Sequence, residues 1–157
     1  SSFSRTLQIH GRKLRGWVIS IEGEMIAPWK ILFESNPCLP LKETYRALEG
    51  HMAGGRIAFD GQETLYLASG DYHWDGMYAP AALAQDEAAD YGKVIAINVF
   101  SGNAEQVSRG HRNTQGIAID NSGSIWVTEQ GVRGGDELNL IKKGENYGWP
   151  DASLGTK

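Results

Sequence analysis

The sequence predicts an all-β fold, and three observations support this prediction. Twenty of the 157 residues are glycine, and they follow apolar runs at places where tight turns are expected. A strand-turn-strand pattern occurs twice, with a spacing of 60 residues. Only residues 79–92 have the alanine-rich composition that favours a helix, and we expect at most a short surface helix there.

The repeated pattern comprises residues 57–69, "IAFDGQETLYLAS", and residues 117–129, "IAIDNSGSIWVTE", which align without a gap. Each copy begins with a short apolar strand, continues with a polar turn, and ends with a strand of β-branched and aromatic residues. Equivalent positions of the two copies are therefore expected to have equivalent places in the fold.

Further strands complete the repeat. Residues 94–97 and 104–109, joined by a turn at "FSGN", predict two strands between the copies, and residues 137–148 contain the third strand of the next unit. Four antiparallel strands per repeat without an intervening helix are the pattern of a β-propeller blade.

The predicted blades divide the single domain into three parts. Residues 1–50 contain three strand-like runs of a preceding blade, residues 51–110 form one blade, and residues 111–157 form a partial blade. A closed propeller needs about four blades, and this sequence accounts for roughly two and a half. We therefore expect a partial or half propeller, which is either a piece of a longer chain or a protomer whose copies assemble to close the ring.

Composition and charge narrow the possible partners. The formal net charge of −4 and the lack of a basic block argue against nucleic acid. No apolar stretch approaches the roughly 20 residues that span a bilayer, and the sequence as given carries no secretory signal. The single cysteine, Cys38, cannot form an internal disulfide.

Four candidate residues should converge at one end of the propeller, near its axis. His51 and Arg112 precede the innermost strands of consecutive blades by six and five residues. Asp71 and Gly131 follow the second strands of the same two blades at equivalent positions. Adjacent repeats present equivalent positions on the same face, so a histidine, an arginine, an aspartate and a glycine-rich turn should meet there.

These residue types suit acid-base and redox chemistry. His51 is the candidate general base, since a histidine side chain exchanges protons readily near neutral pH. Asp71 could hold its ring in one tautomer, and Arg112, next to Asn113, could donate to an anionic or quinone oxygen. The residues alone also allow simpler roles, namely a hydrogen-bonded loop histidine, an aspartate that caps a turn, and an arginine in an ion pair between blades.

Four motifs occur in order between Gly50 and Pro150, namely "GHMAGGRIAFDGQETLYLASGD", "YGKVIAI", "GHRNTQGIAID" and "TEQGVRGGDELNLIKKGENYGWP". In this combination the chain resembles the soluble quinoprotein glucose/sorbosone dehydrogenase family, which includes aldose sugar dehydrogenases. The resemblance implies a six-bladed propeller that uses pyrroloquinoline quinone (PQQ) together with calcium.

The resemblance also implies roles for the catalytic and cofactor-binding residues. His51 matches the base that removes the C1 hydroxyl proton of the sugar while hydride passes to PQQ. Asp71 matches the acid that orients this base. Arg112 and Asn113 match residues that contact PQQ, and the arginine polarises its reactive oxygens.

Calcium ligands are implied in the glycine-rich turn. The main-chain carbonyls of Gly131 and Val132 match those that bind the calcium of the cofactor, although the family often has proline at the position of Val132. Glu137 and the carbonyl of Tyr147 match a second, structural calcium site. Calcium prefers such mixtures of carboxylate and carbonyl oxygens.

The expected function is oxidation of an aldose at C1 by a PQQ-dependent enzyme that passes electrons to an external acceptor. The resemblance implies a periplasmic or secreted protein. The family's other cofactor-contacting residues have no counterpart in these 157 residues, so a second expectation is a non-catalytic, calcium-binding propeller fragment that acts as a binding or assembly module. A calcium-dependent propeller lactonase would need several acidic ligands at the axial end, where only Asp71 is well placed.

Overall fold

The structure is a computed structural model, and it describes residues 2–10, 13–22, 25–26, 30–39 and 51–155. The described residues form strands, turns and bends without a helix, which confirms the all-β prediction. The strands in chain order are β1 (Ser2–His10), β2 (Lys13–Glu22), β3 (Met25–Ile26), β4 (Lys30–Glu34), β5 (Gly54–Phe59), β6 (Thr64–Ser69), β7 (Lys93–Asn98), β8 (Ala104–Arg109), β9 (Thr114–Ile119), β10 (Ile125–Glu129) and β11 (Glu137–Ile141).

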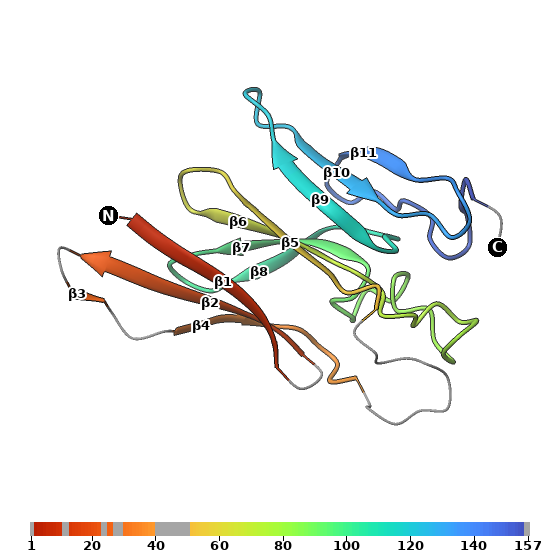
Figure 1. Cartoon of the computed structure of the whole chain (residues 1–157), viewed down its shortest axis with the longest axis horizontal. Helices are drawn as coiled ribbons and strands as arrows, with labels where there is room; N and C mark the ends of the chain where they lie inside the picture. Colours follow the sequence, from red (N-terminus) through yellow and green to blue (C-terminus); the bar gives the residue numbers. More distant parts are fainter. Residues whose placement is uncertain (1, 11–12, 23–24, 27–29, 40–50, 156–157) are drawn as a thin grey trace.

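The strands form three antiparallel sheets. Strands β1, β2 and β3 are neighbours in the first sheet, where β4 also pairs with β2. The second sheet has the order β5-β6-β7-β8 and the third the order β11-β10-β9. Figure 1 shows the second sheet between the other two, so that each sheet follows its predecessor in space as it does in sequence. The boundary expected at residue 50 lies outside the described residues.

The second sheet is buried on both faces, because side chains on both faces of its strands are apolar. Successive side chains of a strand point to opposite faces. One face meets β4 in an apolar layer formed by Leu32, Phe33, Leu65, Leu67, Ile95 and Ile97. The other face meets the third sheet in a layer formed by Ala68, Val94, Val107, Ile125, Val127 and Ile141. The two layers hold the three sheets face to face.

The segment between β6 and β7 differs from the expectation. Residues 79–92 form turns and bends, and the short surface helix that their composition allows does not form. Its apolar side chains, including Ala89 and Tyr91, are buried in a cluster of their own with Leu39, Tyr72 and Trp74. An amphipathic surface helix would leave half of these side chains in solvent, whereas the irregular chain buries them.

Lys93, the first residue of β7, anchors this segment. Its side chain is fully buried, and its Nζ donates to the carbonyls of Leu83 (2.7 Å), Tyr91 (2.9 Å) and Ala84 (3.1 Å). Burial lowers the pKa of Lys93 to about 8, although Asp86 and Asp90 oppose this shift. Since a buried ammonium must be matched by acceptors, the carbonyls that a helix would use internally bind the lysine here.

Candidate functional site

The loops after β6, before β9 and after β10 meet at one end of the second and third sheets. The amide of Asp71 donates to the carbonyl of Arg112 (2.9 Å), and Nη1 of Arg112 donates to the carbonyl of Gly131 (2.9 Å). The three residues therefore form one hydrogen-bonded junction.

Main-chain hydrogen bonds tie the turn that carries His51 to the same junction. The carbonyl of Met52 accepts from the amide of Tyr72 (3.1 Å), and that of Ala53 accepts from Gly70 (2.8 Å). A Cβ atom on Gly70 would lie 1.8 Å from the carbonyl oxygen of Met52, so only glycine permits this approach. His51 is thereby held next to the loop that begins at Asp71.

Three residues near the candidate base have left-handed backbone conformations. The φ angles are +56° at Met52, +55° at Tyr72 and +63° at His73. Such conformations cost free energy for residues other than glycine and are often found at functional sites. The ring of His73 packs edge-on against the ring of His51, with 6.3 Å between centroids.

Asp71 is buried at the centre of the junction. Its carboxylate accepts from the amide of His73 (2.9 Å) and from Nε1 of Trp149 (2.6 Å). Burial raises the pKa of Asp71 to about 7; the two hydrogen bonds and the charge of Arg112 oppose this shift, and the charge of Asp75 adds to it. An acid in this state can exchange a proton near neutral pH.

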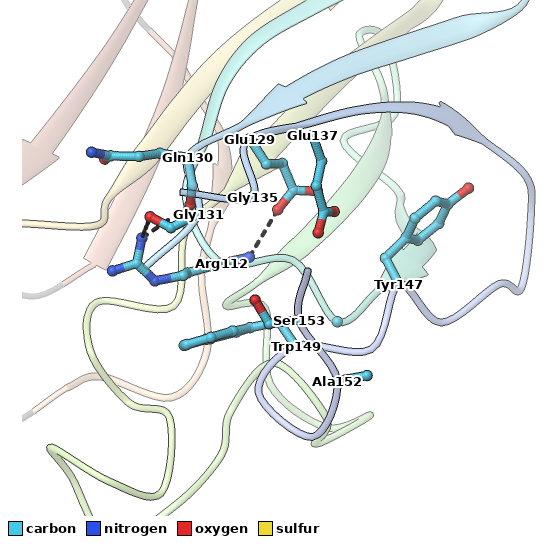
Figure 2. A pocket seen from close by; sticks show the side chains of 11 residues that line it. Arg112, Glu129, Gln130, Gly131, Gly135, Glu137, Tyr147, Trp149, Ala152 and Ser153 are labelled. Carbon is cyan, nitrogen blue, oxygen red and sulfur yellow. Dashed lines mark hydrogen bonds between the residues drawn. The ribbon is translucent and has the colours of Figure 1, made fainter. Parts of the chain in front are cut away.

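The side chain of Arg112 spans the gap between Trp149 and the glycine-rich turn. Its guanidinium carbon lies 5.2 Å from the centroid of the Trp149 ring, within the range of a cation–π contact. Nη1 donates to two successive carbonyls, those of Gln130 (3.0 Å) and Gly131 (2.9 Å), and Figure 2 shows these bonds. The amide of Gly131 in turn donates to Asp136 (2.9 Å).

Asn113 is buried beside the arginine. Its Nδ2 donates to the side chain of Gln130 (3.0 Å), and its Oδ1 accepts from Gln115 (2.7 Å). Its carbonyl accepts from the amide of Gln130 (3.1 Å). These bonds fix the start of β9 to the end of β10.

A small cavity lies between the glycine-rich turn and the chain after β11, and it brings together four of the predicted residues. Its lining consists of Gly110, Arg112, Glu129, Gln130, Gly131, Gly135, Glu137, Tyr147, Trp149, Ala152 and Ser153 (Figure 2). The cavity offers about 20 Å³ to a water-sized occupant, which is enough for one water molecule or ion. Val132 lies in the same turn but does not line the cavity.

Two carboxylates face each other across adjacent strands at this cavity. Glu129 of β10 is paired in register with Glu137 of β11. Nδ2 of Asn139 donates to both, at 3.2 Å to Glu129 and 2.9 Å to Glu137. Like charges directly opposite each other destabilise a sheet, so this pair favours a cation nearby. No group of three or more His, Cys, Asp or Glu side chains in the described part of the chain could hold a metal ion, and further ligands would have to be carbonyl oxygens.

Sequence reasoning missed four residues that contact the predicted ones. His73 donates to Asp71 and packs beside His51, and Trp149 donates to Asp71. Glu129 and His111 form a buried pair behind Arg112. A signal for Glu129 was present, because a carboxylate ends a strand at the position where the preceding repeat has Ser69.

The chain matches known sugar dehydrogenases in sequence and structure. Residues 22–157 match the sequence profile of the family described as Glucose / Sorbosone dehydrogenase. Aldose sugar dehydrogenase YliI from Escherichia coli (strain K12) is 38% identical over 118 residues, covering 68% of this chain and 31% of that protein. The uncharacterized protein slr1608 from Synechocystis is 38% identical over 155 residues, covering 85% of this chain and 35% of that one. The PQQ-bound form of aldose sugar dehydrogenase from Streptomyces coelicolor matches with a TM-score of 0.72 and 28% identity, over 96% of this chain and 44% of that chain.

These matches define the class of the protein as a partial β-propeller of the kind found in aldose sugar and glucose dehydrogenases, which confirms the predicted fold. The chain belongs to the glucose/sorbosone dehydrogenase family, as its motifs imply. It spans about a third of the length of the two curated relatives and just under half of the matched structure. No helix in the described ranges has the length and apolar character that crossing a bilayer requires.

Proposed function

We propose that this chain forms part of the site of a PQQ-dependent sugar dehydrogenase that oxidises an aldose at C1. The observation that supports this most directly is the hydrogen-bonded junction of Asp71, Arg112 and Gly131, next to the turn of His51. It gathers an acid, a cation and an ordered carbonyl beside a candidate base. These are the groups that such an oxidation needs.

The residues fit a cofactor that carries negative charge and a bound metal ion. The carbonyl of Gly131, one of the two implied calcium ligands, faces a cationic group, Nη1 of Arg112. Its oxygen therefore points toward positive charge, and it would exchange this hydrogen bond for calcium, which takes carbonyl oxygens as ligands. Arg112 and Asn113 would hold PQQ, and the carbonyls of Gly131 and Val132 would hold its calcium. When bound, PQQ would supply the redox chemistry by accepting the C1 hydride of the sugar.

The chain's own side chains would manage the proton and the substrate. His51 would take the proton of the C1 hydroxyl, so that loss of a proton and a hydride converts the aldose to its lactone. Asp71 would keep the loop that carries His73 in place beside His51. An external acceptor would then remove the electrons. By its family resemblance, such an enzyme would act in the periplasm or outside the cell.

The second cation site would be the small cavity between β10 and β11. Glu137 and the carbonyl of Tyr147 would bind calcium there, and the opposite carboxylate of Glu129 adds negative charge. This site does not depend on a quinone. It therefore also supports the second candidate function, a calcium-binding propeller fragment without catalytic activity.

Titration of the purified chain with PQQ and calcium tests the cofactor proposal. We expect a change in the absorbance of PQQ on binding, and reduction of an artificial dye when an aldose is added. Calcium binding without any PQQ binding would favour the non-catalytic function instead.

A His51→Ala variant tests the assigned base. Turnover should fall by at least about 100-fold, which is typical for loss of a general base. Binding of terbium, a luminescent substitute for calcium that Tyr147 and Trp149 can sensitise, should be unchanged. A variant that retained full turnover would show that another group takes the proton.

A further inference from the structure

Three buried side chains form a hydrogen-bonded series behind Arg112. Oγ of Ser108 lies 2.8 Å from Nε2 of His111, and Nδ1 of His111 lies 2.5 Å from Oε1 of Glu129. The exposed fractions are 4% for Ser108, 0% for His111 and 7% for Glu129. A carboxylate only accepts hydrogen bonds, so Nδ1 must carry the hydrogen in this pair. The serine is too deeply buried to act as a nucleophile.

Glu129, at one end of this series, contacts the candidate site. Oε2 of Glu129 accepts from the main-chain amide of Arg112 (2.9 Å), as Figure 2 shows. The guanidinium of the same arginine donates to the carbonyls of Gln130 and Gly131, which directly follow Glu129. Arg112 is thus held at both ends by one strand terminus, through its amide and through its side chain.

Comparison of the two repeats shows that this arrangement is specific to the second one. At the spacing of 60 residues, His111 corresponds to His51, and Glu129 corresponds to Ser69. Among the described residues, the hydroxyl of Ser69 bonds main-chain groups of Asp90 and Lys93. His51 is exposed, whereas its counterpart His111 is buried against a carboxylate. The buried histidine–glutamate pair therefore occurs in the repeat that has Arg112, and not in the repeat that has Met52 at the equivalent position.

We propose that His111 and Glu129 are positioning residues that hold Arg112 and the carbonyls of Gln130 and Gly131 in the geometry that receives the cofactor; this inference rests on the proposed function. His111 orients the carboxylate, the carboxylate fixes the amide of Arg112, and the side chain of Arg112 is thereby aimed along the turn. His111 also stacks on Tyr147, with 4.7 Å between ring centroids, and so supports the neighbouring cavity.

Electrostatics agree with this role. Burial by itself would raise the pKa of Glu129, but the hydrogen bond and charge of His111 and the amide of Arg112 lower it overall. The carboxylate therefore stays charged although it is buried. Burying a carboxylate is seldom the most stabilising solution for a core, which argues for a positional function.

A matched pair of substitutions separates positioning from simple stability. In His111→Asn, the side-chain amide can take the place of Nδ1 and still donate to Glu129. In His111→Gln, the amide instead takes the place of Nε2 and the bond to Glu129 is lost. Glu129→Gln leaves one side-chain oxygen, which cannot accept from both Nδ1 of His111 and the amide of Arg112 as the two carboxylate oxygens do. Thr114→Val is the control, because Thr114 is fully buried and its Oγ1 has no partner among the described residues.

Two measurements on the full chain decide the outcome. Hydrogen exchange of the Arg112 amide, followed by NMR without cofactor, should accelerate on the order of tenfold in His111→Gln and Glu129→Gln. The dissociation constant for PQQ with calcium should rise about tenfold or more in the same variants, as for outer-shell residues of metal sites. Thr114→Val should match the wild-type chain in both measurements. His111→Asn keeps the bond to Glu129 but loses the one to Ser108, so its changes should be clearly smaller than those of His111→Gln.

Equal behaviour of His111→Asn and His111→Gln, or unchanged exchange in Glu129→Gln, would overturn the inference. Should the histidine variants fail to fold, Ser108→Ala replaces them, because it breaks only the outer bond of His111 and should give a smaller change of the same sign. Failure of the wild-type chain to bind PQQ would refute the proposed function, whereas the exchange of the Arg112 amide would still decide the positioning role.

Discussion

Asp71 couples the candidate site to pH. It is 1% exposed, and the charged or titratable groups around it are Arg112, Asp75 and His73. Its pKa is raised from the ordinary value of 3.8 to about 7, with burial as the main cause. The folded chain therefore binds a proton on Asp71 between these two pH values, whereas the unfolded chain does not.

The first prediction concerns the pH dependence of stability. The stabilisation from Asp71 is fully present below its unfolded pKa and is lost as pH rises through its folded pKa. An Asp71→Asn variant has no such titration. Its free energy of unfolding should rise relative to that of the wild-type chain by up to about 4 kcal/mol between about pH 4 and pH 8. Urea unfolding at several pH values measures this difference.

The control is Asp120→Asn, because Asp120 is exposed and its pKa is lowered to about 2 by bonds from Ser122, Trp126 and Ser124. Its free energy of unfolding should not rise relative to that of the wild-type chain between about pH 4 and pH 8. A constant difference between Asp71→Asn and the wild-type chain would mean that the buried carboxylate does not titrate near neutrality.

At the scale of elements, the turn between β10 and β11 depends on close main-chain packing. A Cβ atom on Gly131 would lie 2.1 Å from the carbonyl oxygen of Gly134. A Cβ atom on Gly135 would lie 2.3 Å from the amide nitrogen of Gly155. The carbonyl of Gly131 can therefore face Arg112 only while the turn keeps these close approaches.

The second prediction is that Gly131→Ala lowers the free energy of unfolding by about 3 kcal/mol, because the clash involves main-chain atoms that cannot rotate away. It should also weaken terbium binding. Gly123→Ala is the matched control in another turn, with a φ of +83° and no atom within 4 Å of the added Cβ. It should cost only about 1 kcal/mol, the strain of a left-handed residue. Equal losses in the two variants would contradict the packing argument.

The strands were predictable because the same pattern of apolar and polar residues occurs in both copies of the repeat. Residues 57–69 and 117–129 show the same pattern, and each predicted strand in them corresponds to one of β5, β6, β9 and β10. The segment at residues 79–92 was not predictable, because its structure depends on distant partners. Tyr91 donates to the carbonyl of Pro37, and Lys93 collects three carbonyls. Local alanine content carries no information about such contacts.

Predictability of the site follows the same division. The repeat spacing was sufficient to bring Asp71, Arg112 and Gly131 together, since it relates positions on one face of adjacent units. Trp149 was missed because its bond to Asp71 joins segments that the spacing does not relate. Glu129 was missed because the equivalent residue of the preceding repeat, Ser69, carries no charge. The catalytic and metal-binding roles came from motif resemblance and remain proposals.

At the scale of the whole molecule, one face of the third sheet is covered by no other part of the described chain. Leu138 and Leu140 on this face are 66% and 38% exposed. Thr128 and Gln115 line an open groove beside Leu138. Strand β11 pairs with β10 alone among the described strands. Exposed apolar faces and unpaired strand edges favour association.

The third prediction follows from one of the two expectations for a partial propeller, namely that copies assemble to close the ring. On this expectation, the exposed face joins a second copy of the chain. Light scattering should give a mass near twice the 17.2 kDa of one chain. Leu138→Lys places a charge on the face and should restore the mass of a single chain. Phe100→Lys is the control, since Phe100 is 65% exposed in the turn between β7 and β8, away from this face. A single-chain mass for the wild type would exclude this assembly.

The enclosed ammonium of Lys93 has a chemical consequence for the loop between β6 and β7. A reagent that acylates lysine should modify the exposed Lys142 and Lys143 at once but reach Lys93 only when the carbonyls of Leu83 and Ala84 move away. Mass spectrometry of peptides from a time course should show this delay, and disappearance of the delay in dilute urea would locate the opening in this loop. The acylation rate of Lys93 thus measures how often the segment beside the candidate site comes open.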